Sequence, residues 1–180
     1  MRIVGGQLGG RVLRPPQNSP ARPTTERARE GLFNMLEHRM ALENSRALEL
    51  FAGTGAVSFE LLSRTGEAMV TAVEQHGPLA VFMRDTANTL GVAGRLRVVR
   101  GDALKFISAG NGGEQYDLVF ADPPYALREM ALLPGLVLER GLLAEGGWLV
   151  LEHGRQHRFE KLARFVEERA YGEAVFSFFR

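Results

Sequence analysis

The sequence predicts an α/β fold with a mostly parallel sheet that is covered by helices on both faces. Short strand-like runs alternate with helically patterned stretches from residue 46 onward. Right-handed crossovers through such helices make successive strands parallel. The alternation breaks after residue 152, where two strand-like runs follow one another over 163–180. We therefore expect a parallel sheet that ends in an antiparallel pair at its edge.

Each predicted element has its own apolar pattern. Five short runs are rich in apolar residues, as strands of a sheet buried on both faces are. They lie at 46–51, 69–74, 96–100, 117–121 and 148–152. The stretches between them show helical periodicity, and they lie at 56–65, 77–91, 103–109 and 127–140.

Residues 1–40 are expected to form an extension of the main domain, which we place at 41–180. Two short strands around glycine-rich turns are predicted at 2–13 and an extended, proline-rich linker at 14–23. A helix is predicted at 24–40, with Thr24 or Thr25 as its N-cap.

Composition excludes several classes of site. The chain of 180 residues is long enough to bury the core of one domain without disulfides. It has no cysteine, which removes disulfides, thiolate metal ligands and cysteine nucleophiles. His153 and His157 are four residues apart, but Gly154 intervenes and no third ligand is evident, so no metal site is expected. Without a membrane-length apolar run or an apolar leader, the chain is expected in the cytoplasm.

Charge is unevenly distributed. The net charge is only +1, yet residues 1–30 contain six arginines and two glutamates, which gives this segment +4 and leaves −3 for the remainder. Such a basic segment can simply be solvated. Alternatively it can meet an anion such as a nucleic-acid backbone, and arginine favours bidentate contact with phosphate.

The first strand end leads into a glycine loop. Gly53 and Gly55 allow a tight turn and a close approach of a ligand to the backbone. A dinucleotide site would want a third glycine where Ser58 stands, and it would rarely place Glu49 just before a pyrophosphate. A carboxylate at that position suits an ammonium or sulfonium group. A purely structural glycine turn is the alternative.

Acidic residues stand at three further strand ends. Glu74 could accept two ribose hydroxyls or simply be solvated. Asp102 could accept an exocyclic amine or cap the helix that follows it. The fourth end carries Asp122, two prolines and Tyr125. An amino acid, a ribose and an adenine would match the first three ends, which indicates S-adenosylmethionine with its methyl group facing the fourth.

Motifs along nearly the whole chain resemble the bacterial RsmD-like 16S ribosomal RNA guanine-N2 methyltransferases. The matching motifs are RIVGGQLGGRVL, RPTTERAREGLFNML, LELFAGTGAVSFELLSR, VEQ, Asn88, DA, DLVFADPPY and the C-terminal AYGEAVFSFFR. The first two are the specific ones, because many methyltransferases share the later ones. Glu49 and Ser58 depart from the expected aspartate and glycine, and 108–115 looks like a loop of variable length. The resemblance implies a three-layer, Rossmann-like class I methyltransferase fold.

The resemblance also implies a reaction. A methyl group would pass from S-adenosylmethionine to the N2 amine of a loop guanine at position 966 of 16S ribosomal RNA, within an assembled or assembling 30S subunit. Asp122 would accept one amine N–H and the Pro123 carbonyl the other, held in place by the diproline. Tyr125 would stack on the flipped base.

The expected site residues form two further groups. The cofactor residues are Glu49, Phe51, Gly53, Gly55, Glu74, Asp102, Ala103 and Asp122. The substrate residues are Arg11, Arg14, Arg22, Thr25, Arg27 and Tyr125, although Thr25 and Arg27 could instead close over the cofactor. We expect a monomer that needs no metal and no membrane.

Three rival functions remain open at this point. A DNA adenine-N6 methyltransferase would also use the Asp122 turn, but such enzymes usually carry a sizeable target-recognition insertion. A nicotinamide-dependent oxidoreductase would use the glycine loop and Glu74, but it gives Asp122 no task. An inactive RNA-binding relative is disfavoured by the intact Asp122–Tyr125 turn.

Overall fold

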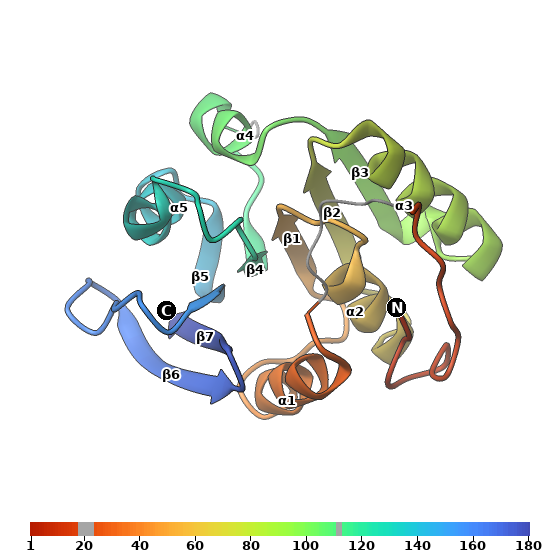
Figure 1. Cartoon of the computed structure of the whole chain (residues 1–180), viewed down its shortest axis with the longest axis horizontal. Coiled ribbons are helices and arrows are strands. Elements are labelled where there is room, and N and C mark those ends of the chain that lie inside the picture. Colours follow the sequence, from red (N-terminus) through yellow and green to blue (C-terminus); the bar gives the residue numbers. More distant parts are fainter. Residues whose placement is uncertain (18–23, 111–112) are drawn as a thin grey trace.

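The computed structural model describes residues 1–17, 24–110 and 113–180. Within these ranges one sheet has seven strands in the order β3-β2-β1-β4-β5-β7-β6 (Figure 1). The strands are β1 Arg46–Leu50, β2 Met69–Glu74, β3 Leu96–Arg100, β4 Tyr116–Ala121, β5 Leu143–Gly154, β6 Phe165–Tyr171 and β7 Ala174–Phe179. Strands β1 to β5 are parallel, whereas β7 and β6 form the expected antiparallel pair at the edge. The predicted α/β class is confirmed.

The chain changes direction across the sheet between β1 and β4. It runs outward from β1 through β2 to β3, and then it returns to place β4 on the other side of β1. In open α/β sheets, ligands bind beyond the carboxyl ends of the strands at this switch point. The topology therefore predicts a ligand site above the ends of β1 and β4.

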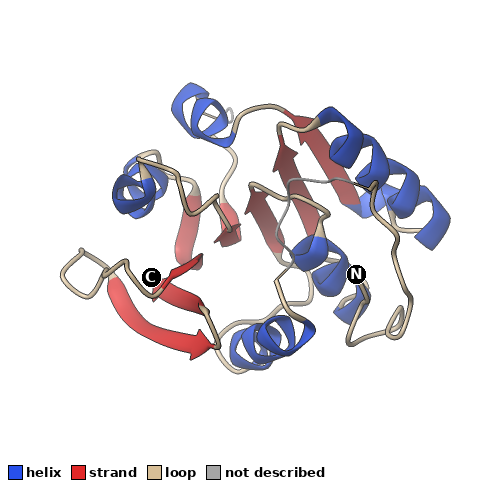
Figure 2. Cartoon of the chain, in the orientation of Figure 1, coloured by secondary structure: helices blue, strands red, loops and turns tan. Residues whose placement is uncertain are grey.

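Helices cover both faces of the sheet (Figure 2). They are α1 Glu26–Glu37, α2 Ala56–Arg64, α3 Gly77–Leu90, α4 Ala103–Ala109 and α5 Leu133–Glu139, with short 3-10 helices at Ala93–Arg95 and Met130–Leu132. One apolar cluster joins α1, α2 and α3 to the sheet, and a second joins α4 and α5 to its other face. None of the helices in the described ranges has both the length and the apolar character that crossing a membrane requires.

Strand β4 shows why four successive residues of a central strand can all be apolar. Leu118 and Phe120 belong to the cluster under α1 to α3, whereas Val119 and Ala121 belong to the cluster under α4 and α5. Successive side chains of a strand point to opposite faces. Because both faces are covered, every position from 118 to 121 must be apolar, and the polar residue that follows marks the end of the strand.

Two predicted elements differ most from the structure in their bounds. The helix expected at 127–140 is only Leu133–Glu139, preceded by a 3-10 turn. Pro134 suits the first turn of a helix, where its missing N–H has no partner to lose. Strand β5 is longer than the expected 148–152, because it begins at Leu143, continues through Gly146 and Gly147 and ends at Gly154.

The N-terminal segment forms a looser hairpin than expected. It has one antiparallel bridge, between Arg2 and Val12, in place of two regular strands. Backbone hydrogen bonds such as Ile3 N–H to Arg11 O at 3.0 Å still hold its two arms together. Ile3 and Leu13 are buried in the cluster under α1 to α3, so the hairpin packs onto the main domain.

Candidate active site

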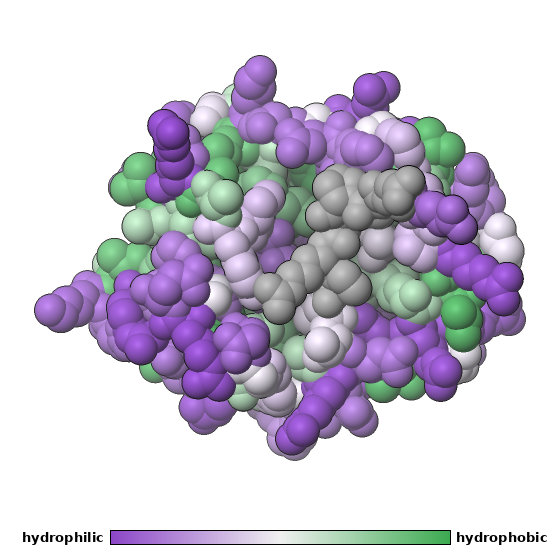
Figure 3. Space-filling view, viewed as in Figure 1, coloured by the Kyte–Doolittle hydropathy of each residue, from purple (hydrophilic) through white to green (hydrophobic). Residues whose placement is uncertain are grey.

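A cleft of about 820 Å³ lies where the carboxyl ends of β1, β2, β4 and β5 meet. Its walls also include the start of α1 and the turn between β6 and β7. On the face shown in Figure 3, hydrophilic side chains follow most of the outline and hydrophobic surface appears further in. The cleft therefore occupies the position that the strand order predicts, and it is large enough for a nucleoside-sized ligand.

The glycine loop forms the floor of the cleft between β1 and α2. Phe51, Gly53 and Gly55 all adopt positive φ angles, between 56° and 72°. At Gly55 a side chain is excluded for a second reason, because a Cβ there would lie 2.9 Å from Met83 Sδ. Phe51 is in a conformation that non-glycine residues seldom adopt, and such strain is common at functional sites. Of the three, Phe51 and Gly53 line the cleft, whereas Gly55 does not.

Glu49 lies in β1, and its buried side chain reaches the first residues of α2. Its carboxylate accepts the N–H groups of Val57 at 3.3 Å and Ser58 at 2.9 Å, and it also accepts the Ser58 hydroxyl. Burial raises the pKa of Glu49 from 4.5 to about 7, although these hydrogen bonds oppose the effect and the nearby Glu74 adds to it. The two positions that depart from the expected aspartate and glycine are therefore direct partners.

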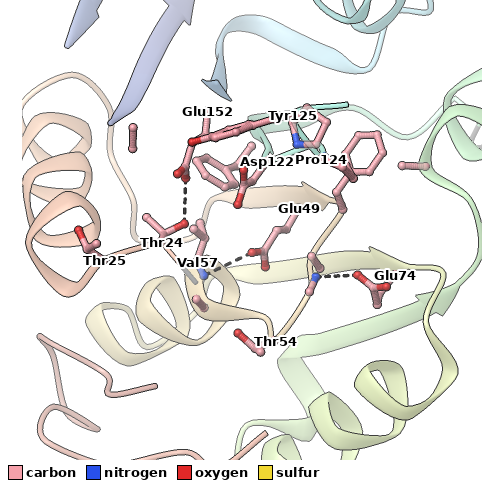
Figure 4. Close-up of a pocket in the computed structure, with 18 of the residues that line it drawn as sticks. Thr24, Thr25, Glu49, Thr54, Val57, Glu74, Asp122, Pro124, Tyr125 and Glu152 are labelled. Atoms are coloured by element: carbon pink, nitrogen blue, oxygen red, sulfur yellow. Dashed lines mark hydrogen bonds between the residues drawn. The ribbon is translucent and has the colours of Figure 1, made fainter. Parts of the chain in front are cut away.

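Glu74 holds the glycine loop to the end of β2. Its two carboxylate oxygens accept the N–H of Gly53 and the N–H of His76, each at 2.7 Å. The side chain is buried yet lines the cleft (Figure 4). A ribose hydroxyl that approached Glu74 would meet a carboxylate already oriented by the backbone.

Asp102 caps a helix, which is the second of the two roles that the sequence allowed for it. It is the N-cap of α4, and its Oδ1 accepts the Lys105 N–H at 2.9 Å. Its neighbours Gly101 and Ala103 line the cleft, whereas Asp102 does not. This end of the cleft is thus formed by backbone and a small apolar side chain.

The turn after β4 projects into the cleft beside the glycine loop. Asp122, Pro123, Pro124 and Tyr125 all line it. The Asp122 N–H still points to Leu50 O at 3.5 Å, so the turn leaves the sheet directly at the switch point. The two prolines fix their own φ angles, which limits the motion of the flanking carboxylate and aromatic ring.

The predicted substrate residues are spread over several places. Thr25 and Arg27 line the cleft, and Thr25 also caps α1 through a hydrogen bond from the Ala28 N–H at 3.2 Å. Arg11 and Arg14 are exposed on the hairpin and do not line the cleft. Arg22 lies outside the described residues.

Arg29 corrects the view of the basic segment. Its side chain is only 1% exposed, and its Nε donates to Glu60 Oε2 at 3.2 Å. Because the guanidinium is buried and paired, Arg29 adds no charge to a surface that could meet a nucleic acid. The basic segment presents fewer cations than its composition suggests.

Sequence reasoning missed Glu152 at the end of β5. This carboxylate is 5% exposed, lines the cleft and accepts the Thr24 hydroxyl at 2.8 Å. The rule that located Glu49, Glu74 and Asp122 would have found it, because Glu152 ends the fifth predicted strand. The turn between β6 and β7, from Tyr171 to Ala174, was also missed as a wall of the cleft.

The histidine pair has no metal-binding arrangement. Nδ1 of buried His153 bonds to Gly154 O at 2.9 Å and Nε2 bonds to the Ser177 hydroxyl at 2.7 Å, while burial lowers the pKa of its imidazole. In the ranges that the structure describes, no cluster of three or more potential ligand side chains could hold a metal ion.

Comparison with known proteins assigns the family. The family model described as "Conserved hypothetical protein 95" matches residues 1–180. The ribosomal RNA small subunit methyltransferase D of Escherichia coli strain K12 is 37% identical over 153 residues, which cover 84% of this chain and 71% of that protein. This chain belongs to the RsmD family.

Solved structures agree with this assignment. A hypothetical protein of Thermus thermophilus superposes with a TM-score of 0.85 at 32% identity, covering 100% of this chain and 99% of that one. A Salinibacter ruber RNA methyltransferase in complex with S-adenosyl-L-homocysteine has a TM-score of 0.66 at 15% identity, covering 87% and 92% of the two chains. The RsmD-family chain therefore has the class I methyltransferase fold.

Proposed function

We propose that this RsmD-family chain transfers a methyl group from S-adenosylmethionine to the N2 amine of guanine 966 in 16S ribosomal RNA. The observation that carries the proposal is the position of the Asp122–Tyr125 turn, which lines the same cleft as Glu49 and Glu74. The name of the Escherichia coli relative, a ribosomal RNA small subunit methyltransferase, supports this substrate class.

The cleft fits S-adenosylmethionine by the chemistry of its walls. Glu49 would face the ammonium of the methionine moiety, and Glu74 would accept the ribose hydroxyls. Phe51, Leu79 and Ala103 give the remaining wall an apolar surface suited to a purine ring. When bound, the cofactor supplies an electrophilic methyl group on a positively charged sulfur atom.

The turn after β4 would hold and orient the target amine. The guanine amine is a poor nucleophile because its lone pair is delocalised into the ring. If Asp122 and the Pro123 carbonyl accept its two N–H groups, the nitrogen becomes more tetrahedral and its lone pair is directed at the methyl group. Tyr125 would stack on the flipped base, which is worth about 1–3 kcal/mol.

The N-terminal segment would contact the RNA outside the cleft. Arg11 and Arg14 are exposed, and Arg27 stands at the mouth of the cleft beside Thr25. Arg22 belongs to the same proposal. We propose that the substrate is the small subunit, because an RNA loop fixed in a particle presents both a base and a surrounding backbone of defined shape.

One incubation tests the substrate directly. The protein is mixed with labelled S-adenosylmethionine and with 30S subunits lacking the modification, free 16S RNA or DNA, and digested products are identified by mass spectrometry. The proposal expects N2-methylguanosine from position 966 of the RNA. Label in N6-methyladenine of DNA would indicate the rival methyltransferase, and no label in any arm would indicate an inactive relative.

A further inference from the structure

We infer that Glu152 reads the N1–H group of the target guanine and thereby selects guanine over adenine. This inference rests on the proposed function, because it adds a second recognition residue to the pocket for the same base. It concerns base identity, which the Asp122 turn does not determine, since that turn suits any exocyclic amine.

Glu152 lies in β5, the strand that pairs with β4, and Asp122 directly follows β4. Strands β4 and β5 are parallel, and Ala121 pairs with Leu151, so Asp122 and Glu152 each come one residue later. Neighbouring strands lie about 4.8 Å apart, a separation that two adjacent hydrogen-bond donors of one base can span. Both residues line the cleft, and Figure 4 shows both carboxyl groups in the same part of it, near Tyr125.

Thr24 orients the Glu152 carboxylate. The Thr24 hydroxyl donates a hydrogen bond to Glu152 Oε2 at 2.8 Å. Thr24 directly precedes Thr25, the N-cap of α1. Glu152 is two residues after Val150 in β5, so both side chains point to the same face of the sheet. Val150 packs in the cluster under α1 to α3, and the Glu152 side chain therefore points toward α1. A buried carboxylate is stable only where donors replace water. Thr24 supplies one such donor to Glu152.

The chemistry of the two purines distinguishes them at this position. Guanine presents adjacent donors, N1–H and the N2 amine, along one edge. A carboxylate only accepts hydrogen bonds, so Asp122 and Glu152 together match two neighbouring donors. Adenine has an unprotonated N1 beside its N6 amine, and that lone pair would face the Glu152 carboxylate. A site built to bond a donor strongly rejects a substrate that lacks it.

The test uses 2-aminopurine, which keeps the N2 amine but has an unprotonated N1. The substrates are 30S subunits reconstituted from 16S RNA in which guanine 966 is retained or replaced through ligation of a synthetic segment. For the wild type we expect much faster methylation of guanine. In Glu152→Gln the side-chain amide can donate to N1, so the ratio of kcat/KM for guanine to that for 2-aminopurine should fall roughly 10-fold to 100-fold.

Three further variants control for folding and charge. Glu145→Gln makes the same change at the exposed start of β5, far from the cleft, and should leave the ratio unchanged. Thr24→Val keeps the charge but removes the orienting donor, and it should lower the ratio in the same direction. Thr24→Ser keeps the hydroxyl and should preserve the ratio. A merely structural role of Glu152 would slow both substrates equally.

The outcomes separate the two proposals. If the wild type does not methylate guanine 966 at N2, the proposed function is wrong and the inference falls with it. If the wild type methylates that guanine but the ratio stays within twofold in both Glu152→Gln and Thr24→Val, the inference alone is overturned. A ratio that falls in both variants supports it.

Discussion

At the scale of single residues, the cleft is defined by carboxylates that are already held by hydrogen bonds. Glu49 and Glu74 accept backbone N–H groups of the glycine loop and of α2. Glu152 accepts the Thr24 hydroxyl. Groups held in this way can bind a ligand without a large loss of side-chain entropy. Asp122 directly precedes two prolines, whose fixed φ angles limit the movement of the turn that carries it.

The role of Asp122 can be tested by truncation. Asp122→Ala removes the acceptor that would orient the amine, so we expect methyl transfer to fall on the order of 100-fold or more, as when one oriented polar group of a catalytic site is lost. The dissociation constant for S-adenosylmethionine, measured by calorimetry, should change only a few-fold. Asp117→Ala, at the other end of β4, is the matched control. Undiminished turnover in Asp122→Ala would refute the role.

The raised pKa of Glu49 predicts that the free energy of unfolding falls as pH rises toward 7. Its pKa is raised to about 7 in the folded state, so between pH 4.5 and pH 7 the unfolded chain ionises more readily and the folded state loses stability as pH rises. The loss attributable to Glu49 is roughly 3 kcal/mol and is complete above pH 7. Urea unfolding at a series of pH values should show this decline in the wild type.

The matched variant for Glu49 is Glu49→Gln, which has no ionisable group. Its free energy of unfolding should be flatter than that of the wild type between pH 4.5 and pH 7. Parallel curves for the two proteins would mean that Glu49 ionises normally in the folded state.

At the scale of elements, one buried carboxylate joins the N-terminal hairpin to α1 and α2. Glu60 accepts the N–H groups of Val4 and Gly5, each at 2.8 Å, and the guanidinium groups of Arg29 at 3.2 Å and Arg64 at 2.9 Å. Both of its oxygens therefore have two donors. These hydrogen bonds hold the hairpin, which has a single β-bridge, against α1 and α2.

Glu60→Gln should be strongly destabilising. The change leaves Arg29 buried beside a neutral amide and turns the amide NH2 toward either the Val4 or the Gly5 N–H group, and breaking such a buried pair costs about 3–5 kcal/mol. Glu37→Gln removes a half-exposed partner of Arg64 and should cost less than about 1 kcal/mol. Urea midpoints at constant m value measure both changes, and equal costs would contradict the central role of Glu60.

At the scale of the whole molecule, net charge is only +1, but the N-terminal segment exposes several arginines, among them Arg2 and Arg27. Arg11 and Arg14 are exposed, while Arg29 is internally paired. If the chain binds RNA as proposed, each phosphate that these arginines neutralise releases counterions. Because the net charge is only +1, we propose that the shape of the particle would supply much of the specificity.

Charge reversal at the hairpin tests this balance. Arg11→Glu with Arg14→Glu should weaken binding to 30S subunits and reduce the slope of log affinity against log salt by roughly 0.7–0.9 for each lost phosphate contact. Arg140→Glu with Lys161→Glu makes the same charge change at exposed positions elsewhere and should leave the slope unchanged. An unaltered affinity and slope in the first double variant would remove the hairpin from the RNA interface.

Apolar patterns along the chain predict the element types and the strand ends that carry acids. Apolar periodicity reports burial on one or two faces of an element, and burial is what strand and helix patterns record. That is why β1 to β4 and the edge pair were predicted closely, whereas β5 was cut short at Gly146 and Gly147. The same pattern located Glu49, Glu74 and Asp122 without any knowledge of the strand order.

Which of these groups meet depends on how the strands and helices pack together. Asp122 and Glu152 become neighbours because β4 and β5 pair, and Arg29 leaves the basic surface because Glu60, 31 residues away, reaches it in the core. Ser58 could not be recognised as the partner of Glu49 from spacing alone, since a hydrogen bond depends on where a strand and a helix pack. Such contacts join residues distant in sequence, and local periodicity carries no information about them.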